Sequence, residues 1–187
     1  MVVKHFDSTG KPGSAFGNDG GTTFPGADAS TADRGRSLLR QSDGRFSVAG
    51  SSFGTASGPY GIDGPLAVGR LTKTGLPDPS FGGGVLTTTK LMFSPFYMTH
   101  VLGHLCDGTV LVAGRLDVAP GNQDLAVLKL DPFGAPLLAF GSSGIATLPL
   151  LGNQSPIGAA KDPTTGKVVV IGGTQTPGQL VAARFNP

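Results

Sequence analysis

Short apolar segments alternate with turn residues along the whole chain. The segments consist largely of aliphatic and β-branched residues, which is typical of short strands. In the middle of the chain they lie at residues 85–90, 97–105, 109–114 and 125–130. The Asp-Gly pairs at 43–44 and 107–108 each separate two such segments. We expect two-residue type I′ hairpin turns there, because Asp and Gly both accept the positive φ that this turn requires.

The pattern is copied three times. Four landmarks recur in the same order: a Phe-Gly pair, a turn that ends in Gly, a small pair that closes an apolar run, and a short apolar segment with a basic residue near its end. They lie at 16–17, 81–82 and 140–141; at 43–44, 107–108 and 165–166; at 49–50, 113–114 and 172–173; and at 66–71, 125–130 and 180–185. The Phe residues are 65 and 59 residues apart, and nearly all of the difference falls between the third and fourth landmarks. A length difference confined to one stretch is typical of a repeat with a variable loop.

The repeat predicts an all-β protein of tandem four-stranded antiparallel blades, which is a partial, three-unit β-propeller. The units run approximately over 7–71, 72–130 and 131–185, in one array that spans 1–187. Met1 takes the repeat position of Leu66 and Leu125, so residues 1–6 are interpreted as a leftover outer strand of a preceding unit. Because a propeller closes with about four to eight blades, three alternatives stay open. The chain is a portion of a longer protein, which we favour, or it forms a homodimer that completes a six-unit ring, or it is an open array.

Composition agrees with strands and excludes several classes of function. The chain holds 31 Gly and 15 Pro among 187 residues, with no Glu and no Trp, which disfavours a helical bundle. Its 39% hydrophobic residues argue against disorder. The net charge of +2 is spread without a basic run, so we expect no nucleic-acid partner. The apolar stretches are too short to cross a membrane and the first residues contain no secretory signal, so we expect no membrane insertion.

Motifs associated with catalysis or metal binding have simpler explanations in this sequence. His100 and His104 have the i, i+4 spacing of zinc ligands on a helix, but in a strand this spacing spans roughly 13 Å. The Gly-x-Ser-x-Gly match at 50–54 lacks the helix that a nucleophile elbow requires. Residues 17–21 resemble one calcium-binding Gly/Asp segment without its sustained period, and a calcium site in that loop stays open. Elsewhere we expect no catalytic residue, no metal site and no cofactor.

Two residue types recur at fixed positions of the unit. Phe16, Phe81 and Phe140 are interpreted as core anchors because they return in phase. A basic residue near the end of the fourth landmark also recurs, and it is interpreted as a strand-end charge that pairs with an Asp in a turn. The residues concerned are Arg70, Lys129 and Arg184, and His5 holds the same position near the start of the chain.

The two stretches whose length varies between units are the candidate contact surface. Loops on one rim of a rigid scaffold commonly carry binding, although they also tolerate insertions without any function. The partner expected there is an unknown protein or a carbohydrate ligand. The candidate residues are Phe53, Tyr60 and Asp63 in the stretch 51–65, and Arg115, Asp117, Asn122 and Gln123 in the stretch 115–124.

The ordered motifs resemble those of the delta-60 repeat family. Residues 75–85 resemble the family's Gly-x-Leu-Asp-x-Ser-Phe-Gly-x-x-Gly signature, and residues 42–50 and 106–114 resemble its Asp-Gly hairpin that runs into Ala-Gly. Residues 183–185 resemble its closing Ala-Arg-Phe. The sequence departs from the signature at Pro77, which stands where the family has Leu. It departs again where Gly13 and Leu137 replace the signature Asp.

The resemblance implies tandem β-propeller repeats from large bacterial proteins and an extracellular or cell-surface location. It implies no catalytic residues. We therefore expect a non-enzymatic repeat module for binding or scaffolding. One alternative is a propeller-type hydrolase or lyase with an active site on its loops, and another is a truncated fragment without autonomous function.

Overall fold

The sequence folds almost entirely into strands. The computed structural model describes residues 1–24, 32–53, 64–93, 100–104, 107–119, 121–150, 152–175 and 178–186. Within these ranges there is no α-helix, and the one helical element is a single 3-10 turn at Gly82–Gly84. The all-β prediction is confirmed. No helix in the described ranges is long and apolar enough to cross a membrane.

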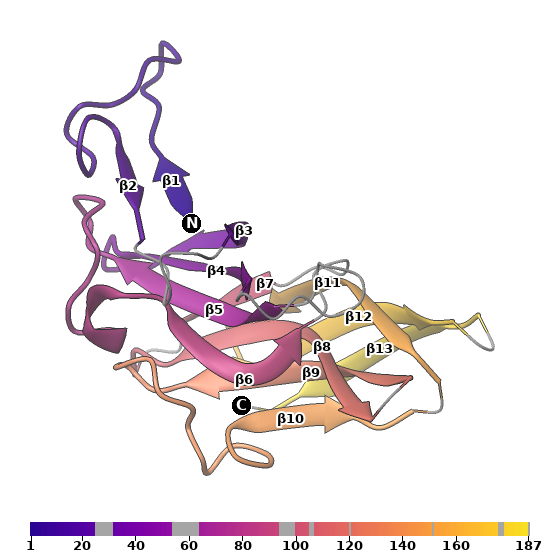
Figure 1. The fold of residues 1–187 in the computed structure, drawn as a ribbon. Helices are drawn as coiled ribbons and strands as arrows, with labels where there is room; N and C mark the ends of the chain where they lie inside the picture. The colour runs from indigo at the N-terminus through magenta and orange to yellow at the C-terminus, as the bar shows by residue number, and fades with distance from the viewer. Residues whose placement is uncertain are drawn as a thin grey trace.

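The strands form four antiparallel sheets in the described part of the chain (Figure 1). We number the sheets in chain order. In each sheet, strands that follow one another in the sequence lie side by side. Sheet 1 holds β1 (Val2–Lys4) and β2 (Gly21–Thr23); sheet 2 holds β3 (Ala32–Arg40), β4 (Phe46–Phe53), β5 (Gly64–Leu71) and β6 (Thr87–Phe93); sheet 3 holds β7 (His100–His104), β8 (Val110–Ala119), β9 (Asn122–Leu130) and β10 (Ile145–Leu148); sheet 4 holds β11 (Gln154–Lys161), β12 (Val168–Thr174) and β13 (Leu180–Phe185).

The repeat is visible in the pairing register. The strand that follows each Phe-Gly pair joins the sheet before it, and it does so in the same register three times. The equivalent pairs are Val3 with Thr22, Val68 with Thr87, and Val127 with Ala146. A full sheet therefore contains the last three strands of one predicted unit and the first strand of the next.

This pairing corrects two predictions about the units. The sheets do not coincide with the ranges 7–71, 72–130 and 131–185, because β2, β6 and β10 pair backwards along the chain. Residues 1–6 are also not an outer strand. They take the position of β5 and β9, which lie inside their sheets, and β2 pairs with β1. The local pattern locates strands, but it does not fix which neighbour each strand chooses.

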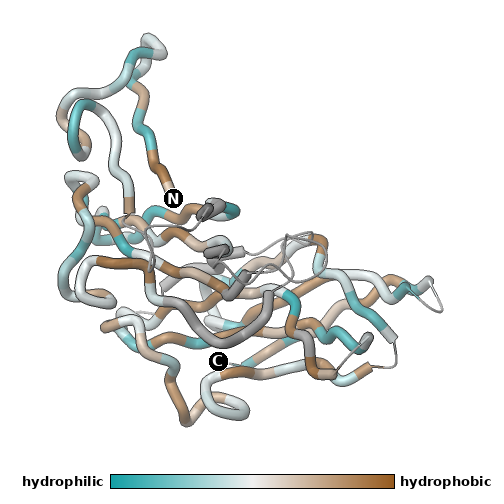
Figure 2. The backbone as a smooth tube through the Cα atoms, viewed as in Figure 1, coloured by the Kyte–Doolittle hydropathy of each residue, from teal (hydrophilic) through white to brown (hydrophobic). Residues whose placement is uncertain are grey.

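Each sheet packs on the next one in chain order. One apolar cluster joins sheet 1 and loop residues to sheet 2 and includes Phe16 and Leu71. A second joins sheets 2 and 3 and includes Phe81, and a third joins sheets 3 and 4. In Figure 2 apolar segments follow the strands in the middle of the stack. The described sheets form a stack and not a closed ring.

Sheet 3 is covered on both faces, which explains why its strands are apolar along their whole length. Val110 and Val112 of β8 pack toward sheet 2, whereas Leu111 and Ala113 pack toward sheet 4. All four side chains are fully buried. A strand that is buried on both faces cannot alternate between apolar and polar residues.

The hairpin turns differ from the predicted type I′ geometry. Gly44 has φ +87° and Gly108 has φ +81°, but neither Asp43 nor Asp107 has a positive φ. In the first turn the Gly44 N–H donates to the Gln41 carbonyl at 3.0 Å, and the Asp43 carboxylate accepts the Arg45 N–H at 3.0 Å. The Asp side chain thus stabilises the turn by a hydrogen bond, and Gly alone adopts the left-handed conformation.

One landmark of the third copy is shifted by one residue. Ala49 pairs with Val68 and Ala113 pairs with Val127, and the equivalent residue of the third copy is Ile171, which pairs with Ala182. The third landmark of this copy is therefore Ile171-Gly172 and not the pair at 172–173, and a larger residue takes the place of Ala. The spacing agrees, because Ala49, Ala113 and Ile171 each lie five residues after the Gly that ends the turn.

Candidate functional site

The first predicted rim stretch lies mostly outside the described residues. Phe53 ends β4, where its backbone pairs with Ala32. Tyr60 and Asp63 lie outside the described residues, as does Cys106. Residues 50–53 of the Gly-x-Ser-x-Gly match lie in β4, so its Ser52 is in a strand.

The second predicted rim stretch is not a loop, so the predicted loop conformation is wrong, and its role as a contact surface stays a prediction. Strands β8 and β9 continue to the end of the stretch and turn at Gly121, which has φ +74°. Arg115 pairs with Leu125 and is 4% exposed. The backbones of Asp117 and Gln123 pair with each other, and Asn122 pairs with Ala119. The alternation of Leu116 and Val118 with polar residues sustains the hairpin, so extra length here extends strands.

Behind this hairpin lies a buried polar cluster around Gln154. Its Nε2 donates to Asp124 Oδ1 at 3.2 Å and to the Leu148 carbonyl at 3.0 Å, and its Oε1 accepts the Leu125 N–H at 3.1 Å. Gln154 is fully buried and Asp124 is 3% exposed. Burial raises the pKa of the Asp124 carboxyl. The cluster ties three strands together, and its polar groups are enclosed, so we assign it a structural role.

The next group of polar residues sits where β5 enters its connecting loop. Arg70 Nε donates to Asp78 Oδ2 at 2.7 Å, and Ser80 donates to Asp78 Oδ1 from its Oγ at 2.6 Å and from its N–H at 3.0 Å. Arg45 reaches the same carboxylate at 3.3 Å. The Arg70 guanidinium lies 4.8 Å from the Phe81 ring centroid. The predicted pairing of a strand-end cation with a turn Asp is confirmed for this copy.

Electrostatics of this group follow from its burial. Burial alone would raise the pKa of Asp78, but the hydrogen bonds from Ser80 and Arg70 outweigh it, so that the pKa of the carboxyl lies below its ordinary value. Burial lowers the pKa of the Arg70 guanidinium, and Asp78 offsets part of that shift. Both groups are charged at neutral pH and form a closed ion pair.

At the equivalent place in the first copy, the ion pair is replaced by aromatic contacts. Gly13 stands where Asp78 stands, and the His5 ring occupies the freed space, because a Cβ on Gly13 would lie 2.2 Å from His5 Nδ1. His5 stacks on Phe16 with ring centroids 5.5 Å apart and an interplanar angle of 27°. Phe46 meets Phe16 edge-on at 5.6 Å and 83°. Three rings thus replace one salt bridge.

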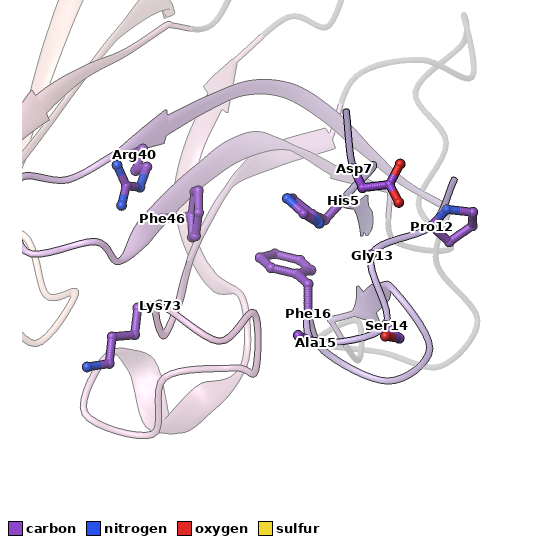
Figure 3. Close-up of a pocket in the computed structure, with 10 residues that line it drawn as sticks. All are labelled: His5, Asp7, Pro12, Gly13, Ser14, Ala15, Phe16, Arg40, Phe46 and Lys73. Atoms are coloured by element: carbon purple, nitrogen blue, oxygen red, sulfur yellow. The ribbon is translucent and has the colours of Figure 1, made fainter. Parts of the chain in front are cut away.

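A pocket of about 710 Å³ opens beside these rings (Figure 3). His5 and Phe46 form its aromatic wall, and the loop residues from Pro12 to Ala15 form another side. Arg40, at the end of β3, and Lys73, in the loop after β5, complete the lining. Its volume is that of a small-molecule site.

The pocket carries two exposed cations and one acid. Arg40 and Lys73 lie across the pocket from the loop residues in Figure 3. The Asp7 carboxylate is engaged in its own turn, where Oδ1 accepts the Thr9 hydroxyl at 2.7 Å and the Lys11 N–H at 3.0 Å. These hydrogen bonds lower the pKa of Asp7. The pocket therefore offers positive charge beside aromatic faces.

Other candidate groups are not brought into this pocket. His100 and His104 lie in β7, as the predicted strand required. Residues 17–21 form a tight turn in which Asp19 has φ +51°. Among the described residues, no three His, Cys, Asp or Glu side chains are grouped to hold a metal ion.

The pocket is not among the sites that the sequence predicts. Gly13 departs from the repeat signature and His5 shares the position of Arg70, and neither fact alone indicates a site. The signal was present in their combination. A small residue in place of the signature Asp removes the partner of the strand-end residue and leaves space beside it.

No protein-family model matches this chain, and no curated protein matches it.

Proposed function

We propose that the chain is a non-enzymatic binding module built from β-propeller-type repeats that resemble the delta-60 family. Three equal strand registers and the packing of each sheet on the next support a blade-like array. The proposal extends to an extracellular or cell-surface setting, which the motif resemblance implies. Loops that a rigid scaffold positions commonly carry binding residues, and the loop between β1 and β2 departs from the repeat signature at Gly13.

The pocket beside His5 is the ligand site in this proposal. The observation that carries it is the exchange of Asp78 for Gly13 at one repeat position, which turns a closed ion pair into an open pocket. The rings of His5 and Phe46 present apolar faces, and Arg40 and Lys73 supply charge. A ring-shaped ligand with a carboxylate matches these features, and an acidic sugar is such a ligand.

The enzymatic alternative has less support. A hydrolase needs an acid with a raised pKa next to a second carboxylate or a base. The one carboxylate in the pocket, Asp7, has a lowered pKa, and the carboxyl with a raised pKa, Asp124, is enclosed with Gln154 elsewhere.

The test is a titration followed by NMR, with two disaccharides that differ only in charge. Cellobiouronic acid carries a carboxylate, and cellobiose is its neutral counterpart. We expect the acid to shift the resonances of His5 and Phe46, and cellobiose to bind more weakly. Arg40→Gln or Lys73→Gln should each weaken binding of the acid by about 1 kcal/mol, roughly fivefold, because each removes one exposed charge.

Lys11→Gln is the matched control. It removes one positive charge from the same loop outside the pocket, so it should leave the affinity nearly unchanged. Equal weakening by Lys11→Gln and Arg40→Gln would show a non-specific charge effect. Absence of any shift at His5 with the acid would refute the acidic sugar as the ligand class.

A further inference from the structure

The contact between neighbouring connecting loops is made twice inside the chain, in the same way. The loop between β1 and β2 places Phe16 on Gly75, where a Cβ would lie 2.7 Å from the ring. The loop between β5 and β6 places Phe81 on Gly134, where a Cβ would lie 3.0 Å from the ring. A main-chain hydrogen bond accompanies each contact: Gly17 N–H to the Thr74 carbonyl at 2.7 Å, and Gly82 N–H to the Phe133 carbonyl at 2.8 Å.

The two halves of a third such contact are present but apart. Phe140 and Gly141 supply one half, and among the described residues no hydrogen bond reaches the Gly141 N–H. Thr9 and Gly10 supply the other half. Nothing lies within 4 Å of a Cβ built on Gly10, and in the same described part no hydrogen bond reaches the Thr9 carbonyl. The two halves belong to opposite ends of the stack.

Strand β13 has a free edge at the same end as Phe140. Strands β5 and β9 each pair on both sides, whereas in the described part of the chain β13 pairs only with β12. Leu180 of β13 is 82% exposed. The residues at the same repeat position, Met1, Leu66 and Leu125, are 8%, 0% and 0% exposed. A large apolar side chain at this position is therefore buried in every other copy.

Strand β1 holds the repeat position of β13 at the other end of the stack. Among the four equivalent strands it is the one with a charged residue at the fourth position. Lys4 stands where the other copies have the buried residues Gly69, Leu128 and Ala183. Its pairing with β2 is short, over Val2–Lys4. Lys4 itself is exposed. Where a further sheet covers this face, as at Gly69 and Leu128, Ala183 fits better because it brings no charge to the covered site.

We propose that two copies of this chain associate head to tail by strand exchange, with β13 of one copy taking the place of β1 in the next. Sheet 4 then gains β2 of the second copy as its fourth strand. Phe140 docks on Gly10 of the second copy, and the Gly141 N–H donates to its Thr9 carbonyl. Every contact of the new interface repeats one that already exists inside the chain. The proposal rests on the repeat array of the proposed function.

The exchanged strand can also form the main-chain hydrogen bonds that β1 forms with the loop between β1 and β2. At present the His5 N–H donates to the Gly20 carbonyl at 2.9 Å, and the His5 carbonyl accepts the Gly13 N–H at 3.0 Å. Arg184 holds the same repeat position, so its main chain makes both bonds after exchange. Its guanidinium then lies over Phe16 of the second copy, as Arg70 lies over Phe81. Leu180 takes the buried site of Met1.

The interface is heterologous, so the array closes as a ring or grows as a filament. Two chains in a ring would contain six sheets, which falls within the range of closed propellers of about four to eight blades. Light scattering coupled to size-exclusion chromatography should give a mass that is a multiple of 18.8 kDa and that rises with protein concentration or reaches twice that value.

The decisive experiment uses paired cysteines in a Cys106→Ser background. Val2→Cys with Thr23→Cys joins β1 to β2 at a paired position and locks the unexchanged chain. We expect the oxidised lock to lose association and reduction to restore it. Val181→Cys with Thr23→Cys joins β13 to β2 across the exchanged interface, because Val181 holds the position of Val2, and it should give a disulfide between chains.

Ala182→Cys with Thr23→Cys is the matched control. It is one residue out of register, so the two thiols face opposite sides of the sheet and should not cross-link. The proposal is overturned if the wild-type chain keeps a mass of 18.8 kDa at every concentration, if the oxidised lock still associates, or if Val181→Cys with Thr23→Cys links only within one chain. Exchange also replaces His5 beside Phe16 by Arg184, so the sugar titration is made in the oxidised Val2→Cys/Thr23→Cys chain, where His5 keeps its place. Failure of sugar binding in that locked chain and failure of association in the unlocked chain can then be told apart.

Discussion

At the scale of single residues, one carboxylate separates a closed ion pair from an open pocket at the same position of the repeat. Asp78 neutralises Arg70, which is 2% exposed, and Asp78→Asn leaves this guanidinium without its counter-charge. We expect a loss of about 3 kcal/mol in the free energy of unfolding at pH 7, measured by urea denaturation. Asp43→Asn removes a carboxylate from an exposed ion pair with Arg45 and should cost less than about 1 kcal/mol.

The pH dependence of this pair has a definite sign. The pKa of Asp78 is lowered in the folded chain, so its contribution to stability is full above the pKa of an unfolded Asp. It is lost as the pH falls through the lowered folded value. The difference between wild type and Asp78→Asn should therefore shrink in acid. A difference that stays constant from neutral to acid pH would contradict an ionised Asp78.

Asp124 should behave in the opposite way. Its pKa is raised by burial, so the folded chain holds the proton more tightly, and stability falls as the pH rises from the unfolded value through the folded one. Asp124→Asn keeps an oxygen that can accept from Gln154 and removes the buried charge. We expect this variant to be at least as stable as wild type at pH 7 and to lose its advantage in acid, as measured by urea denaturation at both pH values. A marked loss at pH 7 would show that the charge itself is needed.

Single positions were only partly predictable from the sequence. The pairing of Arg70 with a turn Asp followed from the phase of the repeat, because a basic residue recurs at that position, although the equivalents of Asp78 are Gly13 and Leu137. The position of Arg115 did not follow. Its stretch reads as polar and variable, and a hairpin extended by such residues has no local signal that separates it from a loop. The spacing of residues in the sequence also did not predict which residues line the pocket, because they come from two loops and two strands.

At the scale of the elements, the connecting loops depend on glycines that meet an aromatic ring. Gly10, Gly75 and Gly134 all have positive φ, but a ring covers only the last two. Gly10→Ala should cost about 1 kcal/mol from backbone strain alone. Gly134→Ala adds a methyl group 3.0 Å from Phe81 and should cost about 3 kcal/mol, measured by thermal or urea unfolding. Equal costs would show that ring contact adds nothing to the backbone requirement.

Strand positions were predictable, and strand partners were not. The apolar segment at 125–130 lies within β9, and the segments at 109–114 and 85–90 overlap β8 and β6. The backward pairing of β6 with β5 depends on the loop between them, which folds on itself through the bridge from Leu71 to Pro77. A turn within a loop has no hydrophobic period, so the pattern could not reveal it.

At the scale of the whole molecule, each sheet gains stability from its immediate neighbours. In such a stack the cost of a core substitution depends on how many neighbours cover the site. Phe81 is fully buried between sheets 2 and 3, whereas Phe140 is partly exposed. Phe81→Ala should cost about 4 kcal/mol and Phe140→Ala about 2 kcal/mol in urea. The measurement should be made in the oxidised Val2→Cys/Thr23→Cys chain, so that association does not contribute.

Equal losses in the free energy of unfolding for Phe81→Ala and Phe140→Ala would contradict a linear stack. The order of the sheets in that stack was implicit in the sequence, because landmarks that recur in the same order imply similar contacts between successive copies. Whether the stack closes was not, since closure depends on small rotations between sheets that no residue pattern records.

The contacts of Phe16 with Gly75 and of Phe81 with Gly134, each on the following loop, have a consequence for how such a chain can change in length. Because every copy brings one ring and one receiving turn, duplication or loss of a whole unit in the gene creates no new kind of boundary. An in-frame recombination between two copies would again place a Phe ring against a Gly turn of the same kind. Addition of whole units thus keeps every contact between loops, whereas insertion of a partial unit would leave one Phe ring without a Gly turn to pack on.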